Sequence, residues 1–113
     1  MAETLTEAVY KQCHYTCIYC GFDGRVFDSW MQLSIDHIVP RCAGGTNDSN
    51  NLTVACRSCN SITSRMKFPP AATRKEILSA KRKKVAEHRQ KIYEYWQETV
   101  APNHLKRPLQ TIR

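Results

Sequence analysis

The stretch Cys17-Ile18-Tyr19-Cys20 and its counterpart Cys56-Arg57-Ser58-Cys59 are separated by 35 residues. Two Cys-x2-Cys pairs at this spacing are typical of a structural zinc site, in which four thiolates hold the ion tetrahedrally. Gly21 follows the first pair and permits the tight turn that such a knuckle needs. We therefore predict a small domain in which one zinc ion joins two segments that are distant in the sequence.

Other cysteines and the start of the chain bear on how these thiols are used. Cys13 and His14 lie beside the first pair and either supply an alternative ligand or pack locally, whereas Cys42 lies in a polar loop as a free thiol. Residues 1–10 have neither the basic start nor the apolar segment of a signal peptide, and no apolar run reaches membrane-spanning length. We therefore expect a cytoplasmic protein, without a membrane partner, whose reduced cysteines bind metal rather than form disulfides.

The 113-residue chain has a formal net charge of +7, and this charge is concentrated at one end. Residues 1–70 contain six basic and six acidic side chains, whereas residues 71–113 contain eleven basic and four acidic ones. Such segregation favours a polyanionic partner, most simply nucleic acid. It also divides the chain into a zinc-containing part, residues 1–70, and a basic helix with its tail, residues 71–113, which either belongs to the same compact domain or is appended to it.

Short elements are expected around the cysteine pairs, and together they predict an α+β fold. Thr4 and Glu7 fit a capping box that begins an N-terminal helix. Residues 33–39 and 52–55 are predicted strands, the turn-rich residues 42–51 an exposed loop, and residues 57–66 a short helix. A further short strand is expected at residues 25–27.

The longest predicted element is a basic helix that begins at a second capping box, Thr73 with Glu76, and runs to about residue 99 before Pro102 ends it. Its apolar stripe is thin, so we expect weak docking or docking by its ends. The stripe consists of Ile77, Val85, Ile92 and Trp96. The aromatic residues near its end, Tyr93, Tyr95 and Trp96, favour a docking patch or dimer contact over a stacking platform.

Asp36-His37 and Asn60 are the residues from which chemistry is expected. Neighbouring side chains on a strand point to opposite faces, so Asp36 and His37 approach a common centre only where the strand ends. A carboxylate suits a hard cation, a neutral imidazole is a base near physiological pH, and Asn60 offers an amide oxygen. One carboxylate and one amide leave most coordination positions to water and phosphate oxygens, as phosphodiester hydrolysis needs.

These residues occur in an order that resembles a known family. The motifs are Cys17-x2-Cys20-Gly21, Asp36-His37-Ile38-x-Pro40, Gly44-Gly45, Asn50-Asn51-Leu52 and Cys56-x2-Cys59-Asn60. Together they are similar to those of the zinc-containing HNH endonucleases, over residues 8–68. The resemblance implies a ββα-metal fold, in which a hairpin and a helix carry the site.

The resemblance also implies a role for each of four residues. His37 corresponds to the general base that activates water, and Asp36 to the carboxylate ligand of a catalytic Mg²⁺ or Mn²⁺. Asn51 corresponds to the middle residue of the motif, which ties down the loop and orients the base. Asn60 stands where the family has its last His or Asn, the second ligand of the ion, so this is an H-N-N variant. The zinc would be structural, because a four-cysteine site has no open position.

Several basic residues are candidates for contact with nucleic acid. Where many relatives have a lysine, three residues after the last motif position, this chain has Thr63, with Arg65 and Lys67 nearby. The candidates are Arg41, Arg65, Lys67, Lys81, Arg82, Lys83 and Lys84. For Arg41 and for the helix, a merely solvated charge is the alternative.

The sequence thus predicts a metal-dependent endonuclease that hydrolyses phosphodiester bonds of double-stranded DNA. One alternative is a zinc-dependent nucleic-acid-binding module that has lost catalysis. The other is a subunit of a phage or restriction complex that docks through its C-terminal helix. A homodimer would explain double-strand cleavage, although no residue of the sequence gives evidence for it.

Overall fold

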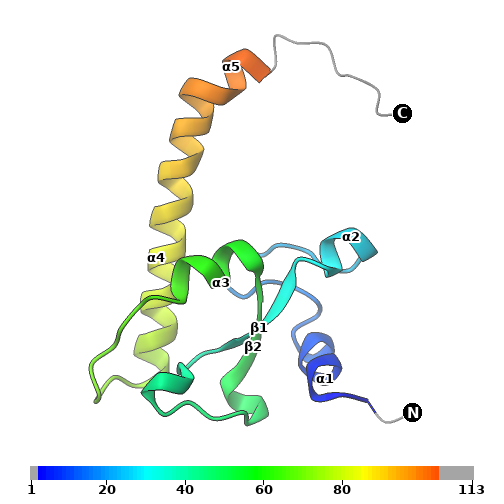
Figure 1. Ribbon diagram of the computed structural model, residues 1–113, viewed down its shortest axis with the longest axis vertical. Coiled ribbons are helices and arrows are strands. Elements are labelled where there is room, and N and C mark those ends of the chain that lie inside the picture. The colour runs from blue at the N-terminus through cyan, green and yellow to red at the C-terminus, as the bar shows by residue number, and fades with distance from the viewer. Residues whose placement is uncertain (1–2, 105–113) are drawn as a thin grey trace.

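The computed structural model describes residues 3–104, and a two-stranded antiparallel hairpin lies at its centre (Figure 1). Strand β1 (Leu33–His37) pairs with strand β2 (Leu52–Cys56), so that Leu33 lies opposite Cys56 and His37 lies opposite Leu52. The predicted α+β class and both of these predicted strands are confirmed. Strand β1 ends at His37, which matters for the site described below.

The hairpin is covered on both faces because its side chains alternate. On one face, helix α1 (Leu5–Gln12) packs on the hairpin. That buried cluster consists of Val9, Tyr10, Leu33, Leu52 and Val54. On the other face, Ala55 and three of the paired cysteines pack with Val85 of helix α4 (Arg74–Tyr95). Every residue of β2 is therefore buried.

The predicted helix starts are confirmed by their caps. The hydroxyl of Thr4 accepts a hydrogen bond from the Glu7 N–H at 3.1 Å and begins α1. Thr73 and Glu76 form the complete capping box that begins α4. Helix α3 (Arg57–Thr63) follows β2 directly, and it positions the residues after the second cysteine pair.

Helix α4 is buried against the body of the protein along its first three turns, as far as Val85. Ile77, Lys81 and Val85, spaced four residues apart on one face, are buried, whereas Ile92 and Trp96 are 54% and 41% exposed. Figure 1 shows the second half of the helix extending away from the hairpin. Of the predicted apolar stripe, Ile77 and Val85 are therefore docked on the body, whereas Ile92 and Trp96 are not. The tail at residues 105–113 lies outside the described residues.

The predicted strand at residues 25–27 is wrong. This segment leads into a short helix, α2 (Phe27–Trp30), and both Val26 and Phe27 are exposed. A strand needs a hydrogen-bonded neighbour, and the pairing nearby is an isolated bridge between Thr16 and Asp23. The β-branched and aromatic side chains of residues 25–27 suggest a strand, but without a pairing partner this segment does not form one.

The prediction that Pro102 ends the long helix is also wrong. After α4 the chain passes through a π-helical turn, η3 (Trp96–Val100), into α5 (Ala101–His104), which contains Pro102. Proline is tolerated in the first turn of a helix, where its missing N–H would have no partner within that helix. Within residues 3–104, no helix combines the length and the apolar character needed to cross a bilayer.

Candidate active site and metal centre

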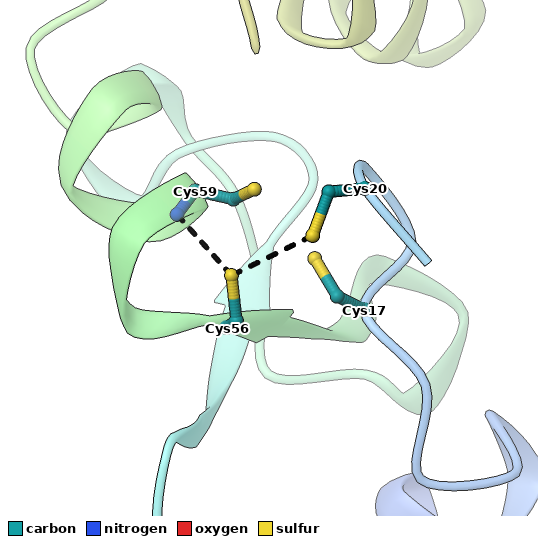
Figure 2. Close-up of side chains that lie close together, drawn as sticks. All are labelled: Cys17, Cys20, Cys56 and Cys59. Atoms are coloured by element: carbon teal, nitrogen blue, oxygen red, sulfur yellow. Dashed lines mark hydrogen bonds between the residues drawn. The ribbon is translucent and has the colours of Figure 1, made fainter. Parts of the chain in front are cut away.

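The four paired cysteines converge on one point, as Figure 2 shows. The Sγ atoms of Cys17, Cys20, Cys56 and Cys59 all lie within 4.8 Å of one another, and those of Cys20 and Cys56 are 3.8 Å apart. Tetrahedral Zn–S bonds of about 2.3 Å place sulfur atoms about 3.8 Å apart. The cluster is therefore compatible with a zinc ion.

Local structure brings these thiols together from two segments. The Gly21 N–H donates to the Cys17 carbonyl at 3.0 Å, and Gly21 has a φ of 76°, which glycine adopts without strain. Cys56 ends β2 and caps α3, where its Sγ accepts the Cys59 N–H at 3.5 Å. Burial raises the pKa of the Cys20 and Cys59 thiols. Metal binding must therefore displace protons from them.

The two remaining cysteines lie outside this cluster. The Sγ of Cys13 lies 3.6 Å from the Thr53 hydroxyl and packs against the α1 side of the hairpin. Cys42 is an exposed free thiol. Of the two interpretations of Cys13, local packing is the one that the structure supports.

A cleft of about 270 Å³ lies beside the end of β1. Among the residues that line it are Asp36, His37, Arg41, Asn60 and Lys81. They come from β1, the loop after it, α3 and α4. Because β1 ends at His37, the neighbouring side chains of Asp36 and His37 both reach this cleft rather than opposite faces of the sheet.

Asp36 is held in a buried position at the base of this arrangement. It is 5% exposed, and its Oδ2 accepts a hydrogen bond from the Tyr19 hydroxyl. The Lys81 Nζ lies 3.5 Å from the same oxygen. Burial raises the pKa of Tyr19, and the charge of Asp36 raises it further, so the phenol stays protonated and remains a donor.

His37 and Asn60 are each oriented by one polar side chain. The His37 Nε2 lies 2.8 Å from Asn47 Oδ1. The Asn60 Nδ2 donates to the Ser34 hydroxyl at 3.0 Å, which leaves the Asn60 amide oxygen available as an acceptor. The cleft thus joins a carboxylate, an imidazole and an amide oxygen.

Residues 17–65, called the HNH segment below, match the family model described as HNH endonuclease. No curated protein and no solved structure matched the chain. The matched segment contains both cysteine pairs, β1, β2 and α3, and it ends before α4. The match to this family model indicates a function related to nucleic acid.

Within the HNH segment, Asn51 holds the loop between the strands. Its Oδ1 accepts the Val39 N–H at 2.9 Å, and its Nδ2 donates to the carbonyls of Val39 at 3.1 Å and Thr46 at 2.9 Å. The Asn51 side chain is buried, and its three hydrogen bonds are partly buried. Asn51 does not line the cleft, but it fixes the backbone two residues after His37.

We expect Asn51→Ala to destabilise the protein by about 2–4 kcal/mol, because three partly buried hydrogen bonds are lost, and two carbonyls and one N–H lose their Asn51 partner. Urea unfolding of the zinc-loaded protein measures this difference. The neighbouring Asn50 is exposed, so Asn50→Ala should change stability by less than about 0.5 kcal/mol. Equal effects of the two substitutions would contradict this account of the loop.

The predicted nucleic-acid contacts fall into three groups around the HNH segment. Arg41 is exposed and borders the cleft. Arg65 and Lys67 are exposed after α3, and Lys67 borders a separate pocket. Arg82, Lys83 and Lys84 are exposed on α4, whereas Lys81 is 2% exposed and points into the site. Lys81 therefore does not belong to the exposed basic face with which it was grouped.

A second, larger cleft of about 700 Å³ lies between α3 and the second half of α4. Its lining includes Arg57, Ser61, Arg89, Tyr93 and Trp96. Ser61 lines this cleft, whereas Asn60 and Thr63 line the smaller one, so the two clefts flank the same helix, α3. The aromatic residues of α4 therefore border a basic groove next to the HNH cleft.

Three residues shape the site in ways that the sequence did not predict. Tyr19 bonds Asp36 from inside the first cysteine pair, and Asn47 bonds His37 from the loop. Neither position carries a signal in the sequence. Lys81 does carry one, since it lies four residues from both Ile77 and Val85 and so shares their buried face.

Proposed function

We propose that this protein is a metal-dependent endonuclease that hydrolyses DNA phosphodiester bonds at the cleft of Asp36, His37 and Asn60. The observation that carries the proposal is that these three side chains line one cleft within an HNH segment. General base, carboxylate and amide are the groups that such hydrolysis requires. The family supplies the class of substrate, since HNH domains act on nucleic acid.

The donor set fits a hard divalent cation, Mg²⁺ or Mn²⁺. Both contacts of Asp36 use Oδ2, and within residues 3–104 no hydrogen bond or ion pair engages its Oδ1. The Asn60 amide oxygen is likewise left as an acceptor, because its nitrogen is bonded to Ser34. Asp36 and Asn60 would hold the ion, which when bound stabilises negative charge on the phosphate and the leaving oxygen.

The surroundings of His37 suit a general base. The amide oxygen of Asn47 only accepts hydrogen bonds, so the neutral ring carries its proton on Nε2 and donates it there. Nδ1 then keeps its lone pair and takes a proton from the water that attacks phosphorus. The attack is in line with the leaving 3′ oxygen, and the resemblance to the family implies 5′-phosphate and 3′-hydroxyl products.

Nicking of supercoiled plasmid tests this proposal. Zinc-loaded protein, dialysed free of other divalent ions, should leave the plasmid intact, and addition of Mg²⁺ or Mn²⁺ should convert it to the open-circular form. A chelator is unsuitable as the metal-free arm, because it would also strip the zinc. Folded protein that nicks the plasmid without any divalent ion would overturn the proposal. Folded protein that fails to nick after addition of either Mg²⁺ or Mn²⁺ would also overturn it, and would favour a binding module without catalysis.

We further propose that the exposed basic face of α4, formed by Arg82, Lys83 and Lys84, contacts the DNA backbone. Phosphate neutralisation releases counterions, so the logarithm of the binding constant should fall steeply with that of salt concentration. Substitution of all three residues by Gln should weaken binding and reduce the magnitude of this slope by about two to three units, since each contact contributes about 0.9. Fluorescence anisotropy with a labelled duplex between low and moderate salt measures both quantities.

The control for the basic face of α4 is a basic residue on another helix. Lys11 is exposed on α1 and pairs with Glu3 at 2.7 Å. Lys11→Gln should leave the salt slope unchanged. If the triple variant keeps the slope of the unmodified protein, α4 does not contact phosphates, and docking on a protein partner becomes the better account of its aromatic residues.

A further inference from the structure

We propose that Lys81 is the resident counter-ion of Asp36, which holds the carboxylate in place before the divalent ion binds and limits the affinity for that ion. This inference rests on the proposed function only in that Asp36 is taken as a ligand of the ion. It assigns Lys81 as a positioning residue, since it acts through Asp36 and His37. It also makes the first half of α4 part of the active site.

The geometry places one ammonium group between two elements of the site. The Lys81 Nζ donates to the His37 carbonyl at 2.8 Å and lies 3.5 Å from Asp36 Oδ2. The side chains of Lys81 and Asp36 are 3% and 5% exposed. A single buried cation therefore holds both the backbone of the proposed base and the proposed metal ligand.

The position of Lys81 is otherwise one for an apolar residue. Ile77 and Val85 lie one turn before and one turn after it, and they are 3% and 1% exposed. Burial lowers the pKa of Lys81, an effect that the charge of Asp36 opposes. A buried lysine without a partner is strongly unfavourable. Packing alone does not account for a lysine here, whereas pairing with Asp36 does.

A cation already present at Asp36 must affect the binding of a second one. The contacts of Lys81 and Tyr19 both use Oδ2, so the divalent ion can approach the carboxylate with Lys81 in place. At such short range and in poorly solvated surroundings, two positive charges repel each other strongly. The lysine therefore weakens the binding of the ion while it secures the geometry of its ligand.

Titration of the zinc-loaded full chain with Mn²⁺ tests this inference by calorimetry. We expect Lys81→Met and Lys81→Gln to bind Mn²⁺ at least about 10-fold more tightly than the unmodified protein, because the competing charge is gone. Lys81→Arg, which keeps the charge, should bind nearly as the unmodified protein does. Lys75 is exposed at the start of the same helix, and Lys75→Met is the matched control without change in affinity.

Thermal unfolding gives a second measurement that a merely structural lysine would not reproduce. Without Mn²⁺, Lys81→Met should unfold at a lower temperature, because Asp36 is left buried without its counter-ion. Saturating Mn²⁺ should raise its unfolding temperature more than that of the unmodified protein. If Lys81→Met does not fold, the double variant Asp36→Asn with Lys81→Met should restore folding, because neither charge remains.

The outcomes separate this inference from the proposed function. Folded Lys81 variants with unchanged or weaker Mn²⁺ binding overturn the counter-ion role, as does a double variant that fails to restore folding. Asp36→Asn should abolish Mn²⁺ binding. If it binds Mn²⁺ as the unmodified protein does, Asp36 is not the ligand, and the proposed metal site fails together with the counter-ion role.

Discussion

Loss of the zinc ion should unfold this protein rather than merely inactivate it. The four thiols join the first knuckle to the end of β2 and the start of α3. Structural zinc contributes on the order of 10 kcal/mol to the folding of small domains, which is comparable to the entire stability of about 5–15 kcal/mol of a typical domain. Burial raises the pKa of the Cys20 and Cys59 thiols, so without the ion these two stay protonated inside the cluster.

The variant that tests this is Cys59→Ser, compared with Cys42→Ser. Cys59 is completely buried in the cluster, whereas Cys42 is exposed in a loop. We expect Cys59→Ser to bind less than one equivalent of zinc and to lose the cooperative thermal transition seen by circular dichroism. Cys42→Ser should keep both. A well-folded Cys59→Ser protein, or a chelated protein with an unchanged transition, would contradict the structural role of the metal.

Replacement of His37 by alanine should abolish most of the cleavage activity without unfolding the protein. A positioned general base contributes roughly 10²–10⁴-fold to a rate, and no other His among residues 3–104 lines the cleft. Among the residues that the structure describes, the His37 side chain forms a hydrogen bond only with Asn47, in an exposed loop. The contact of Lys81 is to the His37 backbone and survives the substitution.

The measurement is the rate of plasmid nicking at saturating Mn²⁺, together with duplex affinity and thermal unfolding. His37→Ala should lower the rate by about 10²-fold or more while affinity and unfolding temperature stay unchanged. His14 is exposed with a φ of 54°, a conformation that asparagine tolerates, so His14→Asn is the control with full activity. Cleavage by His37→Ala at a comparable rate would assign the base to another group.

The residues of the HNH motif could be predicted from sequence because each one is close in sequence to a feature with a strong local signal. Asn60 is adjacent to a cysteine pair, and Asp36 and His37 lie where a β-branched run approaches Pro40. The starts of α1 and α4 could also be predicted from the sequence, since a capping box involves residues only three positions apart. The segment before α2 shows the limit of such signals, because strand formation depends on a partner that local sequence does not reveal.

The environment of each motif residue depended on contacts between distant segments. Tyr19 reaches Asp36 across 17 positions, and Lys81 reaches His37 across 44. Lys81 was grouped with the exposed charges of α4 because composition does not distinguish the faces of a thinly apolar helix. The spacing of Lys81 from Ile77 and Val85 marks its face, but the docking of α4 on the hairpin is what buries Lys81 and leaves Arg82, Lys83 and Lys84 exposed.

The sequence by itself determined the cysteine cluster, the paired strands and the resemblance of residues 17–65 to the HNH endonucleases, because these follow from spacing and local propensity. Tertiary structure alone decided that Asp36 is buried with a lysine and a tyrosine, and that α4 contributes to the site. The physical reason is that a buried charge must find its partner wherever the fold provides one. That partner comes from a helix outside the HNH segment.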